Sequence, residues 1–467
     1  FNEFNREGLI YHMLSTQGPC ACHGDLDGDG VDDVVIPGAK GAFTSLFKGM
    51  PNQSFVPLPR LKEESSQVEF IKCLLFDANR DGHLDLYLAA GGTEESEYSD
   101  NLLDVIYIND GKGNLDKSPQ QLPEVERRVS TGGIASGDIN GDGYDDLVIG
   151  ERLNLLGYGG DCRAYVLIND TQGSFMDQTQ KYAPELLKIG MVTDIQIVDV
   201  NDDQKNDIVL VGDYIAPHIF INKGSKLELL PTQKELSGWW NTLAMADIDN
   251  DGDQDIILGN HGQNSRFRVG EQKSIRMYYA DFDVNGFSEG IIAEQMVDGK
   301  YYPYDLRHNL FKRLPYLTKQ FPDYASFKNA AINEIFSKSQ LDQARILEVH
   351  EMRSGILINE GSLNFTFKAF PSVAQLSPVY AVNVLDINND GFLDIILGGN
   401  LYEVKPEFGK YDASYGLILI NKGNGTFEDK SFDYGLSVTG QVRSIIASHN
   451  HLHFFRNNQS VKSYKLQ

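Results

Sequence analysis

The chain has 467 residues, of which 41% are hydrophobic and 23% are charged. This composition is typical of globular proteins and excludes wholesale disorder and a collagen-like sequence. The 66 acidic residues outnumber the 41 basic ones and give a formal net charge of −25. An acidic chain is a poor candidate for nucleic-acid binding, because Lys and Arg neutralise phosphate groups. No apolar run approaches the roughly 18 to 20 residues of a membrane-spanning helix, so we expect a protein that does not span the membrane.

The chain begins at Phe1 without a Met, which is typical of a processed or excised protein. It contains four cysteines, Cys20, Cys22, Cys73 and Cys162. Four are too few for a disulfide-rich scaffold, and Cys20 and Cys22 alternate as residues on one face of a strand do. We therefore expect the cysteines to be small core residues and not redox or metal ligands.

In chain order, the first recurring feature is an acidic motif of nine residues, D-x-[D/N]-x-D-G-x-x-D, between two apolar segments. Five full copies are loop 1 (25–33), loop 2 (77–85), loop 3 (138–146), loop 5 (247–255) and loop 7 (386–394). Loop 4 (199–207) has Gln204 in place of the Gly, and loop 6 (281–289) has Asn285 and Glu289 at positions 5 and 9. Because strand-like residues flank every copy, each loop is predicted to close a β-hairpin.

A second pattern follows most of these loops: an aliphatic strand, Asn, a Gly-containing turn and another strand. It occurs at 106–115, 167–175, 219–227, 356–365 and 418–427, with weaker copies at 46–55 and 454–464. Two hairpins make a four-stranded unit, and such units repeated around a ring form a β-propeller, whose closure protects the sheet edges. The seven copies predict an all-β, seven-bladed β-propeller as a single domain over 1–467. Eight blades are the alternative, because the chain between 247 and 365 is too long for one plain blade.

One segment of the predicted fifth blade, 301–349, lacks the alternation of a strand. Within it, Phe327, Ala331, Ile335 and Phe336 are spaced as on one face of a helix. We expect a helical insertion here, which either packs on the rim of the propeller or docks a partner.

The acidic loops have the chemistry of calcium sites. Oxygen ligands at alternate positions suit a hard cation, and a Gly at position 6 permits the tight turn. An EF-hand would need a Glu at position 12, where all seven loops have Ile or Leu. Positions 1, 3, 5 and 9 hold 23 of the 66 acidic residues, and the other 43 nearly balance the 41 basic ones. We expect Ca²⁺ at about five sites and up to seven.

The expected ligands are the side chains at four positions of every loop, with the backbone carbonyl at position 7 of the five full copies. They are Asp25, Asp77, Asp138, Asp199, Asp247, Asp281 and Asp386 at position 1; Asp27, Asn79, Asn140, Asn201, Asp249, Asp283 and Asn388 at position 3; Asp29, Asp81, Asp142, Asp203, Asp251, Asn285 and Asp390 at position 5; Val31, His83, Tyr144, Asp253 and Phe392 at position 7; and Asp33, Asp85, Asp146, Asp207, Asp255, Glu289 and Asp394 at position 9. Extracellular calcium modules typically bind at ~10⁻⁴–10⁻³ M, which predicts an extracellular or cell-surface location.

The repeat DINGDGYDDLVIG (138–150) and its relatives resemble the FG-GAP/VCBS repeats of the integrin-α-like propeller family over nearly the whole chain. The segment 398–416, with 274–304 and 441–443, further resembles large surface proteins of Bacteroidetes related to the ASPIC/UnbV and cartilage-acidic-protein group. The resemblance implies a calcium-binding propeller at the outer surface, with a binding role and no known catalytic site.

The propeller face opposite the calcium loops gathers the irregular connections and is the expected ligand surface. The candidate contact residues there are Trp239, Trp240, Arg152, Tyr214, His261, Arg266, Tyr402 and Arg443. Trp239 and Trp240 are neighbours in a strand-like segment, so we expect one in the core and the other free to stack on a sugar or anchor a protein.

The sequence contains no nucleophile elbow, zinc-protease motif, P-loop or dinucleotide-binding glycine pattern. The leading hypothesis is therefore a non-enzymatic, calcium-stabilised surface binding or adhesion module that recognises a glycan or a surface protein and is associated with the outer membrane. The alternatives are a lyase or hydrolase acting on polysaccharide and a structural subunit of an outer-membrane assembly.

Overall fold

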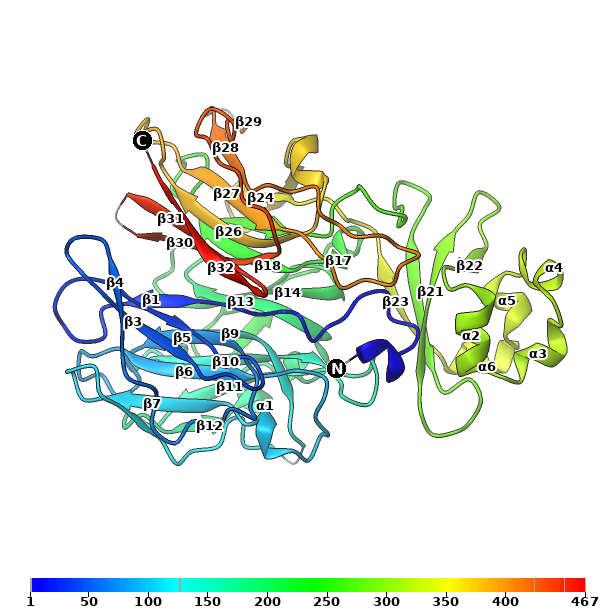
Figure 1. Cartoon of the computed structure of the whole chain (residues 1–467), viewed down its shortest axis with the longest axis horizontal. Helices are drawn as coiled ribbons and strands as arrows, with labels where there is room; N and C mark the ends of the chain where they lie inside the picture. Colours follow the sequence, from blue (N-terminus) through cyan, green and yellow to red (C-terminus); the bar gives the residue numbers. More distant parts are fainter. Residues whose placement is uncertain (1, 126, 424, 449, 467) are drawn as a thin grey trace.

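The computed structural model describes residues 2–125, 127–423, 425–448 and 450–466. Within these ranges the strands form eight antiparallel sheets (Figure 1). Seven of them follow the repeat units and are numbered sheets 1 to 7 in chain order. The eighth, the insertion sheet, comes from the segment between the second and third strands of sheet 5. The prediction of an all-β fold built from four-stranded units is confirmed.

Sheets 1 to 4 are formed by strands that follow one another along the chain. Their strands are β1 (Cys22–Gly24), β2 (Asp33–Ile36), β3 (Ser45–Gly49) and β4 (Phe55–Pro57); β5 (Phe70–Phe76), β6 (Asp85–Ala90), β7 (Val105–Asn109) and β8 (Leu115–Lys117); β9 (Ser130–Gly137), β10 (Asp146–Leu153), β11 (Ala164–Asn169) and β12 (Phe175–Asp177); and β13 (Met191–Val198), β14 (Asp207–Ile215), β15 (His218–Asn222) and β16 (Leu227–Leu229), with β17 (Gly238–Trp239) paired to β14.

Sheets 5 to 7 complete the series. Their strands are β18 (Thr242–Ala246), β19 (Asp255–Gly259), β24 (Gly355–Asn359) and β25 (Phe365–Ala369); β26 (Val379–Leu385), β27 (Asp394–Gly399), β28 (Leu417–Asn421) and β29 (Phe427–Asp429); and β30 (Val442–Ser448), β31 (His451–Arg456) and β32 (Gln459–Lys465). Short helices lie between the strands: η1 (Glu3–Asn5) precedes sheet 1, and η2 (Asp100–Leu102) lies between β6 and β7 of sheet 2. The helices that connect successive sheets are α1 (Thr179–Tyr182), η3 (Pro184–Lys188), η4 (Lys234–Leu236) and η5 (Ser372–Gln375).

The seven sheets are arranged as a propeller-like ring. The first strand of each sheet contacts the first strand of the next, from β1 and β5 through to β26 and β30. Ala21 and Val34 of the first repeat unit pack with Ile446 and Phe455 of sheet 7, so the last sheet meets the first. The N- and C-terminal parts of the chain therefore join to close the circle.

The core lies in layers between neighbouring sheets. On β10, Leu147 and Ile149 pack against sheet 2, whereas Val148 packs against sheet 4. Successive side chains of a strand point to opposite faces, so a strand between two sheets must be apolar on both. This requirement explains the continuous apolar runs that follow the acidic loops.

The insertion is longer than the 301–349 expected from the sequence. Its sheet has the order β22-β21-β20-β23 and includes two strands that precede residue 301. Its elements are β20 (Ile275–Ala280), β21 (Glu289–Gln295), β22 (Tyr301–Pro303), α2 (Arg307–Arg313), α3 (Leu317–Gln320), α4 (Tyr324–Phe327), α5 (Ile332–Ile335), α6 (Lys338–Gln343) and β23 (Arg345–Val349). The boundary was misplaced because β20, loop 6 and β21 copy the hairpin pattern of the ring. Sheet and helices extend together from one side of the ring (Figure 1).

The N-terminal segment lies between the ring and the insertion (Figure 1). Ile10, Tyr11 and Leu14 are buried in one cluster with side chains of the ring and the insertion. Backbone hydrogen bonds tie the segment to the connection after β27: Met13 donates to Glu403, and Lys405 donates to Tyr11. This part of the ring face is thus covered by the chain itself.

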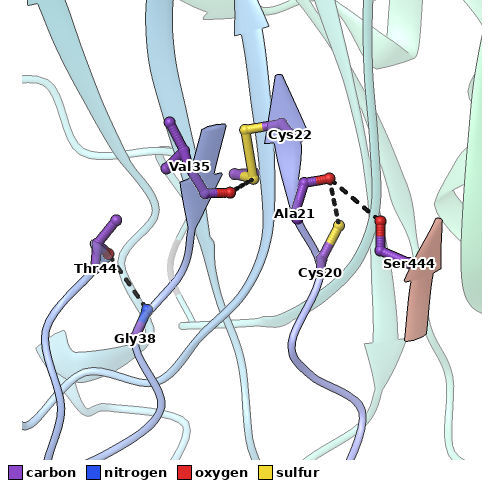
Figure 2. Close-up of a disulfide and its surroundings, with 8 residues drawn as sticks. Cys20, Ala21, Cys22, Val35, Gly38, Thr44 and Ser444 are labelled. Atoms are coloured by element: carbon purple, nitrogen blue, oxygen red, sulfur yellow. Dashed lines mark hydrogen bonds between the residues drawn. A yellow bond between two sulfur atoms is a disulfide. The ribbon is translucent and has the colours of Figure 1, made fainter. Parts of the chain in front are cut away.

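The cysteine prediction is wrong for one pair. Cys22 of β1 and Cys73 of β5 form a disulfide with their Cα atoms 5.8 Å apart (Figure 2). Cys20 and Cys162 are free thiols. The bonded residues are 51 positions apart, so their pairing depends on sheets 1 and 2 lying side by side, which local alternation does not reveal.

Candidate metal-binding loops and the covered face

All seven acidic loops share one backbone conformation. The carboxylate at position 1 accepts N–H groups from positions 5 and 6, as when Asp77 accepts from Asp81 (3.1 Å) and Gly82 (2.8 Å). The side chain at position 5 accepts the N–H of position 7, as Asp81 does from His83 (3.0 Å). The loop backbone thus curls around the carboxylate at position 1.

Loop 4 keeps this conformation although it lacks the Gly at position 6. Gln204 adopts a left-handed φ of 65°, and its N–H donates to Asp199 at 2.6 Å. In loop 1 the equivalent Gly30 has a φ of 84° and donates to Asp25 at 2.7 Å. A non-glycine residue in this region costs about 1–2 kcal/mol, so loop 4 is formed at a conformational expense that the full copies avoid.

Position 9 anchors each loop to the sheet. Asp146 is fully buried and accepts the N–H of Ile139 at 2.9 Å and that of Asn169 at 2.8 Å. Asp85 and Asp255 make the equivalent pairs of hydrogen bonds. Each of these carboxylates stands at the start of the second strand and joins position 2 of the loop to the last residue of the third strand.

In three of the loops, the carboxylates lie close enough together for each loop to bind one cation. Ligand oxygens lie within 4.8 Å of one another in three groups: Asp25, Asp27 and Asp29; Asp247, Asp249 and Asp251; and Asp281, Asp283 and Glu289. In each group one oxygen at position 3 is buried without a hydrogen-bond partner, namely Oδ1 of Asp27, Asp249 and Asp283. A buried carboxylate oxygen without a donor is costly, and a cation is the partner that this geometry fits.

The loops with Asn at position 3 have the same four candidate ligand side chains, with one negative charge fewer. The Asn140 amide donates to Asp142 at 2.9 Å, and the Asn388 amide donates to Asp390 at 2.8 Å. These bonds hold the position 3 and position 5 side chains together beside the position 1 carboxylate. The amide oxygen is an acceptable ligand for a hard cation.

Burial raises the pKa of the position 9 carboxyls. The pKa rises to about 6 for Asp85, Asp146, Asp207 and Asp255, and to about 7 for Glu289. Neighbouring carboxylates of the same loop add to the rise. A divalent cation in the loop would favour the ionised forms and lower these pKa values again.

Loop 1 already has a positive group beside its acidic residues. The Lys48 ammonium, from β3, contacts Asp27 and lies 2.6 Å from Asp29. These two carboxylates raise the pKa of Lys48 above its usual value. The ammonium lies where it competes with a cation for two of the loop's carboxylates.

Sequence reasoning missed the residues that link one loop to the next sheet. The Asn169 side-chain amide donates to the carbonyl of Ala78 in loop 2 (2.7 Å) and to that of Asp145 (2.9 Å). Asn109, Asn222, Asn359 and Asn421 donate in the same way to the loop of the preceding sheet. The Asn of the second hairpin pattern was visible in the sequence, but its role depends on the packing of neighbouring sheets.

The loops are not distributed as one per sheet. Six of them connect the first two strands of sheets 1 to 6, whereas loop 6 connects β20 to β21 in the insertion sheet. Sheet 7 has no copy of the motif in its sequence. The ring and the insertion therefore each carry candidate metal ligands.

The predicted ligand surface is mostly buried. The expectation that one tryptophan is exposed is wrong: Trp239 and Trp240 are 2% and 0% exposed. Trp239 stacks on Tyr11 of the N-terminal segment, with ring centroids 5.1 Å apart, and Trp240 packs between sheets 4 and 5. The two side chains point in opposite directions, but the N-terminal segment covers one of them and sheet 5 covers the other, so neither is exposed.

The other candidate contact residues divide in the same way. Arg152, Tyr214, His261 and Arg443 are buried, so they are not available to a large ligand at the surface. Arg266 is exposed and Tyr402 is half-buried. Tyr402 lies in the connection after β27, and Arg266, from the connection between β19 and β20, donates to the carbonyl of Glu407 in it at 3.3 Å.

Comparison with known proteins supports the repeat assignment. The model of the FG-GAP-like repeat matches residues 77–149 and 199–258. The chain contains FG-GAP-like repeats. These two matches include loops 2 to 5 and begin at the first residue of loops 2 and 4. The search of curated proteins finds no match to this chain.

Solved structures of low similarity are numerous. The chain is 11% identical to the V. cholerae biofilm matrix protein Bap1 (98% of this chain and 88% of that one covered, TM-score 0.39). It is 16% identical to an Agrocybe aegerita lectin that recognises non-reducing terminal N-acetylglucosamine (88% and 79%, 0.40). It is 10% identical to YCF48 bound to D1 peptide (98% and 96%, 0.43). These similarities are too low to support any statement about function.

Among the described residues, no helix is long and apolar enough to cross a membrane.

Proposed function

We propose that this chain is a seven-bladed β-propeller whose acidic loops bind Ca²⁺ and stabilise a non-enzymatic binding module. The observation that supports calcium best is the group of converging carboxylates in loops 1, 5 and 6, each with one buried oxygen that lacks a donor. All-oxygen ligand sets suit Ca²⁺ better than zinc, which prefers Cys and His. The seven sheets of the ring support the number of blades.

The proposed location is the outer surface of the cell. Calcium at the affinities of extracellular modules is bound only where the ion reaches about millimolar concentration. The disulfide between Cys22 and Cys73 supports the same compartment, because such bonds persist in oxidising surroundings. The relation to Bacteroidetes surface proteins of the ASPIC/UnbV and cartilage-acidic-protein group is part of this proposal.

The proposed partner is a glycan or a surface protein, bound at the exposed rim around Arg266 and Tyr402. These two residues are the members of the predicted ligand set that keep solvent contact. Arg266 lies over the ring of Phe408, with its guanidinium carbon 4.8 Å from the centroid. A cationic group beside aromatic rings is suited to hydrogen-bonding and stacking on a polar ligand.

A binding screen tests this role. The purified chain is exposed to glycans, polysaccharides and outer-membrane extracts in about 1 mM calcium, with a parallel arm in EDTA. We expect a ligand whose binding is lost in Arg266→Ala or Tyr402→Ala and kept in Arg60→Ala, a change of an exposed arginine on sheet 1's side of the ring. Turnover of a polymer by the purified chain would contradict the non-enzymatic role. Equal binding by all three variants would contradict the proposed surface.

A further inference from the structure

The first strands of the ring surround a cavity of about 190 Å³. Its lining includes Lys72 on β5, Asp194 on β13, Tyr380 on β26 and Arg443 on β30, together with Arg152 at the end of β10. This volume is several times the roughly 30 Å³ that one water molecule occupies in the liquid. The cavity can therefore hold a molecule of several non-hydrogen atoms.

Positive charge exceeds negative charge in the lining. Lys72 is paired with Asp194 at 2.7 Å, which neutralises the half-buried end of the cavity. The Thr242 hydroxyl and the Leu243 N–H donate to the second oxygen of Asp194, at 2.9 and 3.0 Å. Both oxygens of Asp194 therefore already accept hydrogen bonds, and the described residues of the lining contain no other carboxylate that could pair with its two arginines.

Arg152 is a buried arginine whose guanidinium has one nitrogen without a hydrogen-bond partner among the described residues. It is 5% exposed, and its Nη2 pairs with Asp213 at 2.8 Å. The Tyr158 hydroxyl donates to the same oxygen of Asp213 at 2.7 Å. The Nη1 of Arg152 is buried and has no hydrogen-bond partner. An unpaired donor on a buried cation is costly, so this group is expected to have a ligand.

Arg443 brings a second buried positive charge to the same cavity. It is 8% exposed, and its guanidinium lies over the Tyr380 ring, 4.2 Å from the centroid. Its N–H groups donate to the carbonyls of Thr16, Asn400 and Val442 and to the Gln441 side chain, all of which are neutral. Within the described residues it forms no ion pair; Glu403 acts on it electrostatically from outside the lining.

We propose that this cavity binds a small carboxylate anion, which accepts a hydrogen bond from Nη1 of Arg152 and offsets the charge of Arg443. Lys72 is paired with Asp194 and Arg152 with Asp213, so among the lining residues that the structure describes the charge of Arg443 is the one without an ion pair. A single positive charge matches a monoanion better than a phosphate, which carries nearly two negative charges at pH 7. A planar carboxylate also fits the planar guanidinium. This site is separate from the calcium loops. It adjoins the surface proposed for a glycan or protein at Gln441, whose Oε1 accepts hydrogen bonds from Arg443 and from the Tyr402 N–H.

The test compares acetate with acetamide, which has the same shape and no charge. Binding to the intact chain is measured by saturation-transfer NMR and by calorimetry in calcium-containing buffer. We expect acetate to bind at least tenfold more tightly than acetamide. Arg152→Gln should reduce acetate affinity at least tenfold, whereas Arg60→Gln, the same change at an exposed arginine, should leave it unchanged.

Several outcomes would overturn the proposal. They are no acetate binding, equal binding of acetate and acetamide, tighter binding of sulfate than of acetate, and unchanged acetate affinity in a folded Arg152→Gln chain. If Arg152→Gln does not fold by circular dichroism, Arg152→Lys keeps the charge and removes the second donor group. The comparison of acetate with acetamide on the unaltered chain decides the matter without any variant.

Discussion

Removal of calcium is expected to destabilise the chain by an amount that the loops allow us to calculate. A site with a dissociation constant of ~10⁻⁴–10⁻³ M contributes about 0.4–1.4 kcal/mol to the free energy of unfolding at about 1 mM calcium. Seven such loops would contribute about 3–10 kcal/mol together, and the three with converging carboxylates about 1–4 kcal/mol.

The corresponding shift in melting temperature is modest because the chain is long. An unfolding entropy of about 2.1 cal/mol/K per residue makes 1 kcal/mol equivalent to about 1 °C for 467 residues. We therefore expect EDTA to lower the Tm by about 1–10 °C, the span from three weak sites to seven tight ones, and added calcium to restore it. Differential scanning calorimetry gives the shift, and elemental analysis after dialysis gives the number of ions bound.

Two substitutions in loop 5 separate a lost ligand from a lost charge. Asp249→Ala removes the position 3 ligand, whose Oδ1 is buried without a donor, and should lower the calcium content by about one ion at limiting calcium. Asp253→Ala removes the same charge at position 7, where the expected ligand is the backbone carbonyl, and should leave the content unchanged. An EDTA-insensitive Tm with no bound calcium would refute the reasoning, as would equal loss of calcium in the two variants.

Three further predictions concern particular side chains. Lys48→Met removes the ammonium that competes in loop 1, so the variant should retain more calcium than the unaltered chain when dialysed against low free calcium; equal retention would contradict this competition. Asn169→Ala leaves two carbonyls of the loop region without a donor and should cost about 2–4 kcal/mol of unfolding free energy by denaturant titration, whereas a cost below about 1 kcal/mol would show that the link matters little. Burial lowers the pKa of His12 and of His261 to about 3, so the folded state binds fewer protons than the unfolded state below pH 6.5 and stability is lost as the pH falls. Between pH 7 and pH 5 each histidine should lower the free energy of unfolding by about 2 kcal/mol, and His261→Gln should halve the combined loss, measured by denaturant titration at both pH values. An identical pH dependence in the variant would contradict this role of His261.

The acidic loops and the strands beside them were predictable because their information is local. A nine-residue motif specifies its own turn through hydrogen bonds between residues up to five positions apart, such as Gly82 to Asp77. The continuous apolar run of strands such as β10 then requires a sheet on either side, which leads from the repeat to a ring. All-β structure, four-stranded units and their antiparallel hairpins follow from these patterns alone.

The environment of the predicted ligand residues was decided by contacts between distant parts of the chain. Trp239 is buried because Tyr11 of the N-terminal segment stacks on it, and the two residues are more than two hundred positions apart. Arg152 and Arg443 were expected on an open face, but the ring places both around one cavity. The bond between Cys22 and Cys73 likewise depends on the contact between sheets 1 and 2. A periodic pattern states which face of a strand is buried, whereas only the folded chain determines which segment covers it and which charges remain without a partner.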